Sequence, residues 1–269
     1  GVFEGKTTGC PIAMIVENKD QDSSKYDNLK DIFRPGHADF TFFKKYGIRD
    51  HRGGGRTSGR ETIGRVAGGT LAKELLNKMG VKIIAYTLKI GDVSANKIDY
   101  DVIEKNPVRS CDKDASEKME SLILEAKKNM VSLGGIVGIE VKGLPAGIGD
   151  PVFAKLDARL GMALLSIGAV KGIEFGLGFE FAKLTGEQSN DPMNDGKFVS
   201  NNAGGILGGI STGEDIVMRI VVKPTPSIAK PQKTINKNGE NVSIEIKGRH
   251  VPCILPRIIP VVESMVSLV

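Results

Sequence analysis

Helix-like and strand-like segments alternate along the middle of this 269-residue chain, and this pattern limits the folds open to it. The apolar spacing of a helix with one buried face occupies 58–79, 115–133 and 152–165. Short apolar runs that predict strands occupy 81–89, 135–142, 170–175 and 215–223. Because strands and helices alternate only in part, the pattern predicts a mixed fold, either α/β or α+β.

The pattern is weaker toward both ends. An apolar run predicts a buried strand at 11–17, and another predicts a helix at 258–269. The polar segment 228–247 is typical of a hairpin or surface loop around Asn238-Gly239. The sequence 134–139 also resembles 204–209, which suggests a duplicated βαβ-like unit.

Composition restricts the class of protein. The net charge of +5 favours anionic ligands only weakly, because the excess is local. Cys10, Cys111 and Cys253 are too widely spaced for a disulfide framework or a zinc pattern. They predict no metal site and a reducing, cytoplasmic setting. No apolar run approaches the roughly 18 residues of a membrane-spanning helix.

The positive charge is concentrated in residues 34–65. This basic stretch holds eight Arg and Lys residues against three acidic residues, together with His37, His51 and a triple glycine. Guanidinium groups bind phosphate and carboxylate through a fixed fork, and glycine lets backbone amides approach an anion. The basic stretch therefore predicts a site for a multiply charged anion.

The end of the basic stretch runs into the first predicted helix. Ser58 and Glu61 have the spacing of a capping box, so the glycine-rich turn would lie at a helix N-terminus. Unpaired backbone N–H groups there favour an anion. The competing interpretation is nucleic-acid binding through the single RGG element at 52–54, but RGG elements usually occur in low-complexity repeats.

Other segments carry similar chemistry. His37 is a candidate acid that could gain a proton when an anion binds, whereas His51 fits a solvated loop equally well. Small polar and basic residues recur in the glycine-rich loop 200–213, in Lys223–Ser227 and in 248–250. Together these segments suit one large site for a phosphate-bearing cofactor and an anionic substrate.

Five blocks of the sequence together resemble the chorismate synthase family. They are RPGHADFTFFKKYGIRDHRGGGRTSGRE at 34–61, GLPAGIGDPVFAKLDARLGMALLSIGAVKGIEFG at 143–176, SNNAGGILGGISTG at 200–213, KPTPS at 223–227 and GRHVPCILPRIIPVVESM at 248–265. The resemblance covers nearly the whole chain in the family's order.

The resemblance implies an α+β fold of the family's β-α-β sandwich type. It implies a lyase of the shikimate pathway in which phosphate leaves 5-enolpyruvylshikimate 3-phosphate by 1,4-anti elimination to give chorismate. The family uses reduced FMN with no net redox change. Its members are homotetramers; some reduce FMN with NADPH, and others rely on an external flavin reductase.

Site residues follow from the resemblance by position. It implies catalytic roles for His37, which matches the histidine beside the N1/O2 edge of the flavin, and for Ser58. It implies substrate binding by Arg60 and Arg249. The residues that match the family's FMN segments are Arg56, Thr57, Ser58, Gly168, Ala169, Gly208, Lys223, Pro224, Thr225, Pro226, Ser227 and Arg249.

The sequence departs from the family pattern in three ways. We expect a single domain over 1–269 that lacks the family's opening Gly-Glu-Ser-His-Gly segment and has a shortened C-terminal helix. Val251 stands where the family has the aspartate of an Arg-His-Asp motif, which helps to move a proton off flavin N5. Two functions therefore remain open: an FMN-dependent lyase, or a catalytically impaired protein of this type that binds flavin or anions.

Overall fold

A computed structural model of the chain describes residues 1–19, 22–52, 58–246 and 251–269. Its centre is a five-stranded sheet in the order β4-β3-β5-β11-β6. These strands are β4 (Val93–Ser94), β3 (Lys82–Ile90), β5 (Gly135–Lys142), β11 (Ile216–Val222) and β6 (Val170–Phe175). Each neighbouring pair is antiparallel. Since β5 and β6 both pair with β11, they run parallel to each other and are joined by a helix, as a split β-α-β unit.

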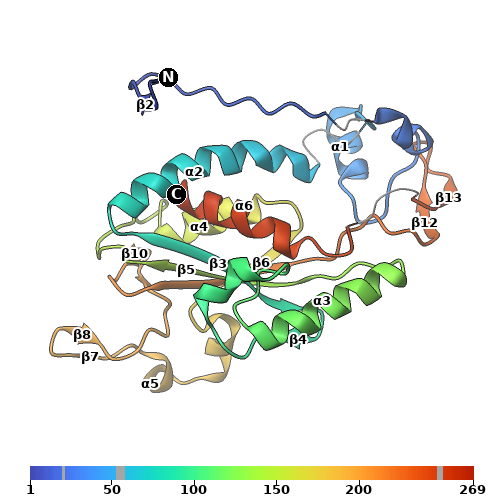
Figure 1. Cartoon of the computed structure of the whole chain (residues 1–269). Coiled ribbons are helices and arrows are strands. Elements are labelled where there is room, and N and C mark those ends of the chain that lie inside the picture. Colours follow the sequence, from blue (N-terminus) through green and yellow to red (C-terminus); the bar gives the residue numbers. More distant parts are fainter. Residues whose placement is uncertain (20–21, 53–57, 247–250) are drawn as a thin grey trace.

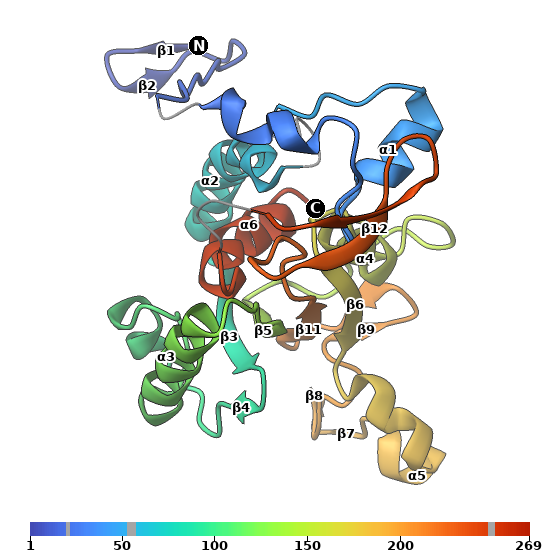
Figure 2. The same cartoon turned by 90° about the vertical axis from the view of Figure 1, so that its right-hand side faces the viewer.

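Helices cover both faces of the sheet (Figure 1). On one face lie α6 (Leu255–Ser267) and α4 (Leu156–Leu165), with α2 (Thr62–Lys78) stacked outside α6. On the other face lies α3 (Lys113–Lys128), which Figure 2 shows below the sheet and on the opposite side from α6. This arrangement is the mixed α+β fold that the sequence resemblance implied.

The core is aliphatic and alternates along the strands. In β11 every second residue from Ile216 to Val222 is at most 1% exposed. Leu255, Ile259 and Val262 of α6 are equally buried, so α6 fills the space over the sheet. Burial of these side chains stabilises the fold by about 2 kcal/mol each.

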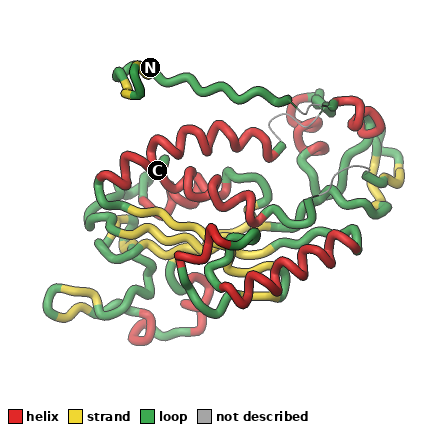
Figure 3. The backbone as a smooth tube through the Cα atoms, in the orientation of Figure 1, coloured by secondary structure: helices red, strands yellow, loops and turns green. Residues whose placement is uncertain are grey.

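Smaller elements surround the sheet (Figure 3). The hairpin β12 (Gln232–Ile235) and β13 (Asn241–Ile244) packs with the 3-10 helix η1 (Ser23–Leu29) around Leu29 and Ile244. The remaining described elements are β1 (Val2–Phe3), β2 (Lys6–Thr7), α1 (Asp39–Tyr46), η3 (Gly59–Glu61), η4 (Tyr100–Lys105), η5 (Gly178–Lys183), α5 (Gly186–Ser189), β7 (Met193–Asn194), β8 (Lys197–Phe198), β9 (Ile206–Leu207) and β10 (Ile210–Ser211).

Most of the predicted elements are confirmed. The strands at 135–142 and 170–175 match β5 and β6, and the hairpin around Asn238-Gly239 is present. The predicted strand at 11–17 is wrong, because this segment has no regular structure and is largely exposed. Its apolar residues meet no partner strand among the described residues.

The two similar glycine segments adopt different structures. Gly135 opens the long central strand β5, whereas 204–209 contribute to the short hairpin of β9 and β10. The resemblance between the two segments therefore does not extend to their structure.

Among the described residues, no helix combines the length and apolar character needed to cross a bilayer.

Candidate functional site

His37 lies in a cluster of charged side chains just before α1. The Asp39 carboxylate receives hydrogen bonds from Arg34, with Nε donating to Oδ2 at 2.7 Å and Nη2 to Oδ1 at 2.9 Å. Arg49 Nη1 lies 2.8 Å from Asp39 Oδ1, and His37 Nδ1 lies 2.9 Å from the same oxygen. Asp39 is only 2% exposed, so the two guanidinium groups hold a buried carboxylate beside the imidazole.

The electrostatics of this cluster follow from its contacts. Burial by itself would raise the pKa of Asp39, but hydrogen bonds from Arg34 and His37 outweigh it and hold the pKa well below its usual range. Asp39 is therefore ionised at neutral pH. Arg49 is fixed in turn, because its Nη2 donates to the carbonyls of Leu29, Lys30 and Ile32.

The turn that carries His37 lies against the Lys223–Ser227 segment. Lys223 Nζ donates to the Gly36 carbonyl at 2.6 Å, although 187 positions separate the two residues. A Cβ placed on Gly36 would lie 3.3 Å from Pro226 Cβ, and the φ of Gly36 is +67°. Glycine fits this close approach and left-handed backbone. The structure thus brings two of the predicted site segments together.

The segment around Ala169 joins the same region. The Lys223 N–H donates to the Ala169 carbonyl at 2.9 Å, beside Gly168 at the end of the α4–β6 connection. Ala169 has a φ of +74°, which is uncommon for a residue with a Cβ. Gly168 and Ala169 therefore lie next to Lys223 at one end of β11.

Val251 contacts this segment through its backbone. Thr225 Oγ1 donates to the Val251 carbonyl at 2.8 Å, and Ser132 Oγ donates to the Thr225 carbonyl at 2.7 Å. Pro224 and Ser227 lie in the same connection after β11. Position 251, where the sequence resemblance predicts an aspartate in the family, is thus adjacent to the predicted FMN segment.

Ser58 and Arg60 lie at and within η3, immediately before α2. Ser58 is the N-cap of η3, and its hydroxyl accepts from the Arg60 N–H at 3.3 Å. The predicted capping box is not formed, because the Glu61 N–H donates to the Ser58 carbonyl and the Glu61 carboxylate pairs with Arg65 at 3.0 Å. The Arg60 side chain is exposed and has no ion-pair partner among the described residues.

Arg65 links the start of α2 to the end of α4. Its Nη1 donates to Ser166 Oγ at 2.6 Å and its Nη2 to the Ser166 carbonyl at 3.3 Å. Ser166 precedes Gly168 by two residues. The Ser58–Arg60 turn, Gly168-Ala169 and Lys223 consequently lie toward one end of the sheet.

Gly208 is the exception. It lies in the β9–β10 turn, next to Gly209, whose carbonyl accepts from the Leu156 N–H at the start of α4. The strand β11 begins near this turn and ends before Lys223. Seven residues of strand span about 20 Å. Within one chain, Gly208 therefore lies at the opposite end of the sheet from Lys223.

Three predicted site residues cannot be placed. Arg56, Thr57 and Arg249 lie outside the described residues. The predicted anion site at the glycine-rich turn 53–57 lies there as well.

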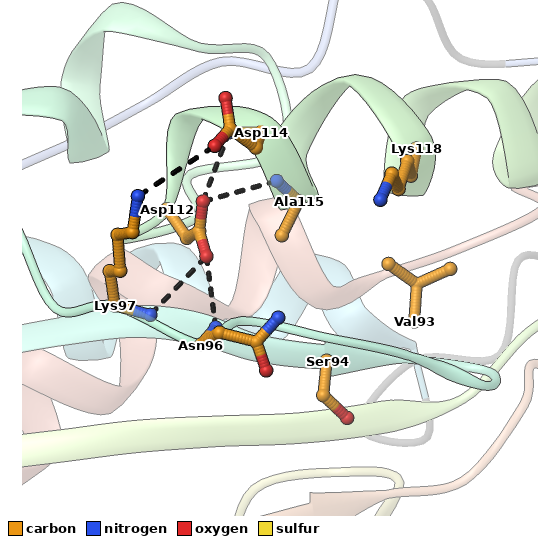
Figure 4. A pocket seen from close by; sticks show the side chains of 8 residues that line it. All are labelled: Val93, Ser94, Asn96, Lys97, Asp112, Asp114, Ala115 and Lys118. Carbon is orange, nitrogen blue, oxygen red and sulfur yellow. Dashed lines mark hydrogen bonds and ion pairs between the residues drawn. The ribbon is translucent and has the colours of Figure 1, made fainter.

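A cavity of ≈ 370 Å³ lies elsewhere, between β4 and the start of α3 (Figure 4). Its most buried acidic group, Asp112, caps α3 and accepts from the backbone N–H groups of Asn96, Asp114 and Ala115. These hydrogen bonds lower the pKa of Asp112 and occupy its oxygens. None of the predicted site residues lines this cavity.

Sequence reasoning missed the roles of Asp39, Arg34 and Arg49. In the sequence, Asp39 was noted only as one of three acidic residues among the eight basic residues of the basic stretch. The spacing Arg34-x-x-His37-x-Asp39 is compatible with one tight turn, and it is the signal that could have indicated the cluster. Arg49 could not have been assigned, because its approach depends on how the chain returns after α1.

Comparison with known proteins agrees with this geometry. The family model described as chorismate synthase matches residues 1–269. A chorismate synthase of Methanococcoides burtonii is 55% identical over 278 residues, covering 100% of this chain and 76% of that protein. One from Desulfatibacillum aliphaticivorans is 53% identical over 269 residues, covering 100% of this chain and 75% of that protein.

The fold agrees as well. A solved structure titled "Crystal Structure of Chorismate Synthase" matches with a TM-score of 0.71 and 29% identity, over 86% of this chain and 68% of that one. Sequence similarity, the fold and the contact between the predicted site segments lead to the same assignment. The chain therefore belongs to the chorismate synthase family, whose members are carbon–oxygen lyases of the shikimate pathway that act on phosphates.

Proposed function

We propose that this chain eliminates phosphate from 5-enolpyruvylshikimate 3-phosphate in a 1,4-anti sense to give chorismate, with reduced FMN and no net redox change. The observation that carries the proposal is the contact between the His37 turn and the Lys223–Ser227 segment, made by Lys223 Nζ and the Gly36 carbonyl. It joins the candidate proton donor to the candidate flavin-binding segment.

The charges of the described residues fit a phosphate-bearing cofactor. Arg34, Arg49 and Lys223 oppose a single carboxylate, Asp39, so the region has an excess of positive charge. Lys223 uses one ammonium proton on Gly36 and has further donors for an anion. Lys223, Thr225, Ser227 and Ala169 would hold FMN, together with Arg56, Thr57 and Arg249. When bound, reduced flavin supplies electron density as the C–O bond breaks.

Each protein group has a distinct task in this proposal. His37 would hold a proton beside the flavin. The positive charges of Arg34, Arg49 and Lys223 would favour the anionic form of the reduced flavin. Ser58 would orient the Arg60 backbone just before α2, since its hydroxyl accepts a hydrogen bond from the Arg60 N–H. The exposed Arg60 guanidinium meets the phosphate or carboxylates of the substrate, with Arg249 as its companion.

We also propose that the protein works as a cytoplasmic homotetramer. Gly208 lies far from Lys223 within one chain, so it can serve an FMN site only through a second copy or through a rearranged loop. A homotetramer supplies second copies. The flavin would be reduced by NADPH or by an external flavin reductase.

Val251 favours the second candidate function, a protein that binds flavin without turnover. A valine side chain cannot accept a proton, and position 251 is adjacent to Thr225. In this alternative the fold and the anion site persist while elimination fails.

The test is chorismate formation by the full-length protein with dithionite-reduced FMN under anaerobic conditions. We expect turnover, and we expect His37→Ala to lower it by about 10²-fold or more while FMN affinity changes less. His51→Ala is the matched control, because the His51 ring lies 3.8 Å from the exposed carboxylate of Asp27, which is not one of the predicted site residues. Flavin binding without turnover, restored by Val251→Asp, would support the alternative.

A further inference from the structure

One ring nitrogen of His37, Nδ1, faces the buried cluster. Nδ1 lies 2.9 Å from Asp39 Oδ1 and 3.1 Å from Arg34 Nη2. A carboxylate only accepts hydrogen bonds and a guanidinium only donates them. Nδ1 can therefore carry a proton for Asp39 or present a lone pair to Arg34, but it cannot do both.

The geometry favours a proton on Nδ1. If Nδ1 were unprotonated, its lone pair would face the Asp39 oxygen at 2.9 Å, and two acceptors would repel each other. With a proton on Nδ1 that contact becomes a charge-assisted hydrogen bond. Arg34 Nη2 loses little, because it already donates to Asp39 Oδ1 at 2.9 Å.

Asp39 is held firmly enough to impose this choice. Its side chain is 2% exposed, and Arg34 and Arg49 both bind it. The Arg34 backbone N–H adds a further hydrogen bond to Oδ2 at 3.1 Å. The charged groups around the ring are thus Arg34, Asp39 and Arg49 from its own side and Lys223 from the facing segment, through Gly36.

We propose that Asp39 is a positioning residue that keeps the proton on His37 Nδ1, so that Nε2 is the atom through which His37 exchanges protons. In the neutral ring Nε2 then carries the lone pair, and in the imidazolium Nε2 carries the transferable proton. Asp39 stays ionised in both states. The consequence for catalysis rests on the proposed function, whereas the tautomer does not.

The first experiment measures the tautomer directly. The full-length protein is labelled with 15N in its histidine rings, and the signals of His37 are identified as those that disappear in His37→Gln. Ring 15N shifts are recorded over a pH series, and the tautomer is read from the signals of the neutral ring. We expect a protonated Nδ1 and an unprotonated Nε2; the reverse pattern would overturn the proposal.

Variants then separate positioning from folding. Asp39→Asn is expected to lose the preference for a protonated Nδ1, and to lower kcat by roughly 10²-fold with a smaller change in KM. Arg49→Lys weakens the hold on the carboxylate but keeps the contact between His37 and Asp39, so the Nδ1-protonated pattern should persist. An Asp39→Asn protein with the wild-type 15N pattern would contradict the inference.

The two proposals fail in different ways. A protonated Nδ1 in a protein that forms no chorismate would leave the role of Asp39 standing and reject the lyase function. Normal turnover in a protein whose neutral His37 ring is protonated on Nε2 would support the lyase function and reject the role of Asp39. If Asp39→Asn does not fold, the wild-type measurement still decides.

Discussion

At the scale of single residues, the most informative group is Asp39. It is an acid within a basic stretch, and it is buried at 2% exposure. Removing a buried carboxylate from paired guanidinium groups leaves their charges uncompensated, which costs about 3–5 kcal/mol. Asp39 therefore contributes to both the stability of the His37 turn and the orientation of the imidazole.

The depressed pKa of Asp39 predicts how that contribution depends on pH. A carboxyl group whose pKa is lower in the folded state stabilises it above the unfolded pKa of about 4 and loses this effect as pH falls further. We expect the unfolding free energy of the wild type to exceed that of Asp39→Asn by about 3 kcal/mol at pH 7. Below pH ~4 the difference should shrink by up to about 1.4 kcal/mol per pH unit.

Urea titrations of both proteins between pH 3 and pH 7 measure this difference. Comparison of the two proteins cancels the other carboxyl groups, which titrate in both. A difference that stays constant down to pH 3 would show that the ion pairs of Asp39 do not contribute as described.

At the scale of elements, the contact of α2 with α6 decides how the layers stack. A Cβ on Gly69 would lie 2.3 Å from Ser264 Cβ and 2.5 Å from Ser264 Cα. The absence of a side chain at Gly69 therefore sets how closely the helices approach. Through Arg65 and Ser166, the position of α2 also fixes where Ser58 and Arg60 lie.

Two adjacent glycines of α2 give a matched test of this packing. Gly69→Ala should lower the unfolding free energy by about 1–3 kcal/mol, because the backbone of α6 must move. A Cβ on Gly68 meets nothing within 4 Å, so Gly68→Ala should instead raise stability by about 0.5–1 kcal/mol through helix propensity. Urea unfolding measures both, and equal stabilities for the two variants would contradict the packing argument.

At the scale of the whole molecule, two features suggest that the chain works with further copies of itself. The sheet separates Gly208 from the other site segments. In addition, the outer helix α2 exposes apolar side chains. Leu71 and Leu75 of α2 and Met79 at its C-cap recur every four residues and are 45%, 61% and 69% exposed. A stripe of this kind on an outer helix is typical of an interface. A second copy of the chain is the occupant that the proposed homotetramer supplies.

Assembly can be tested on this stripe. We expect Leu75→Lys to shift the protein from tetramer toward smaller species in size-exclusion chromatography with light scattering, because the charge would be buried between copies. Leu124→Lys on α3 is the matched control, since Leu124 is similarly exposed, at 59%, on the other face of the sheet. An unchanged tetramer with Leu75→Lys would place the subunit contact elsewhere.

Most of the elements and the chemical character of the site could be predicted from the sequence. Periodicity of 2 or 3.6 residues is a local property, so it located β5, β6 and α2, and the blocks around His37 and Lys223 carried the family resemblance. Which segments come into contact could not be predicted, because it depends on how the whole chain folds. The order of the strands brings Gly36 into contact with Lys223 and places Gly208 at the other end of the sheet. The exposed segment 11–17 shows a second limit. An apolar run becomes a strand only where a partner strand is available to pair its backbone groups.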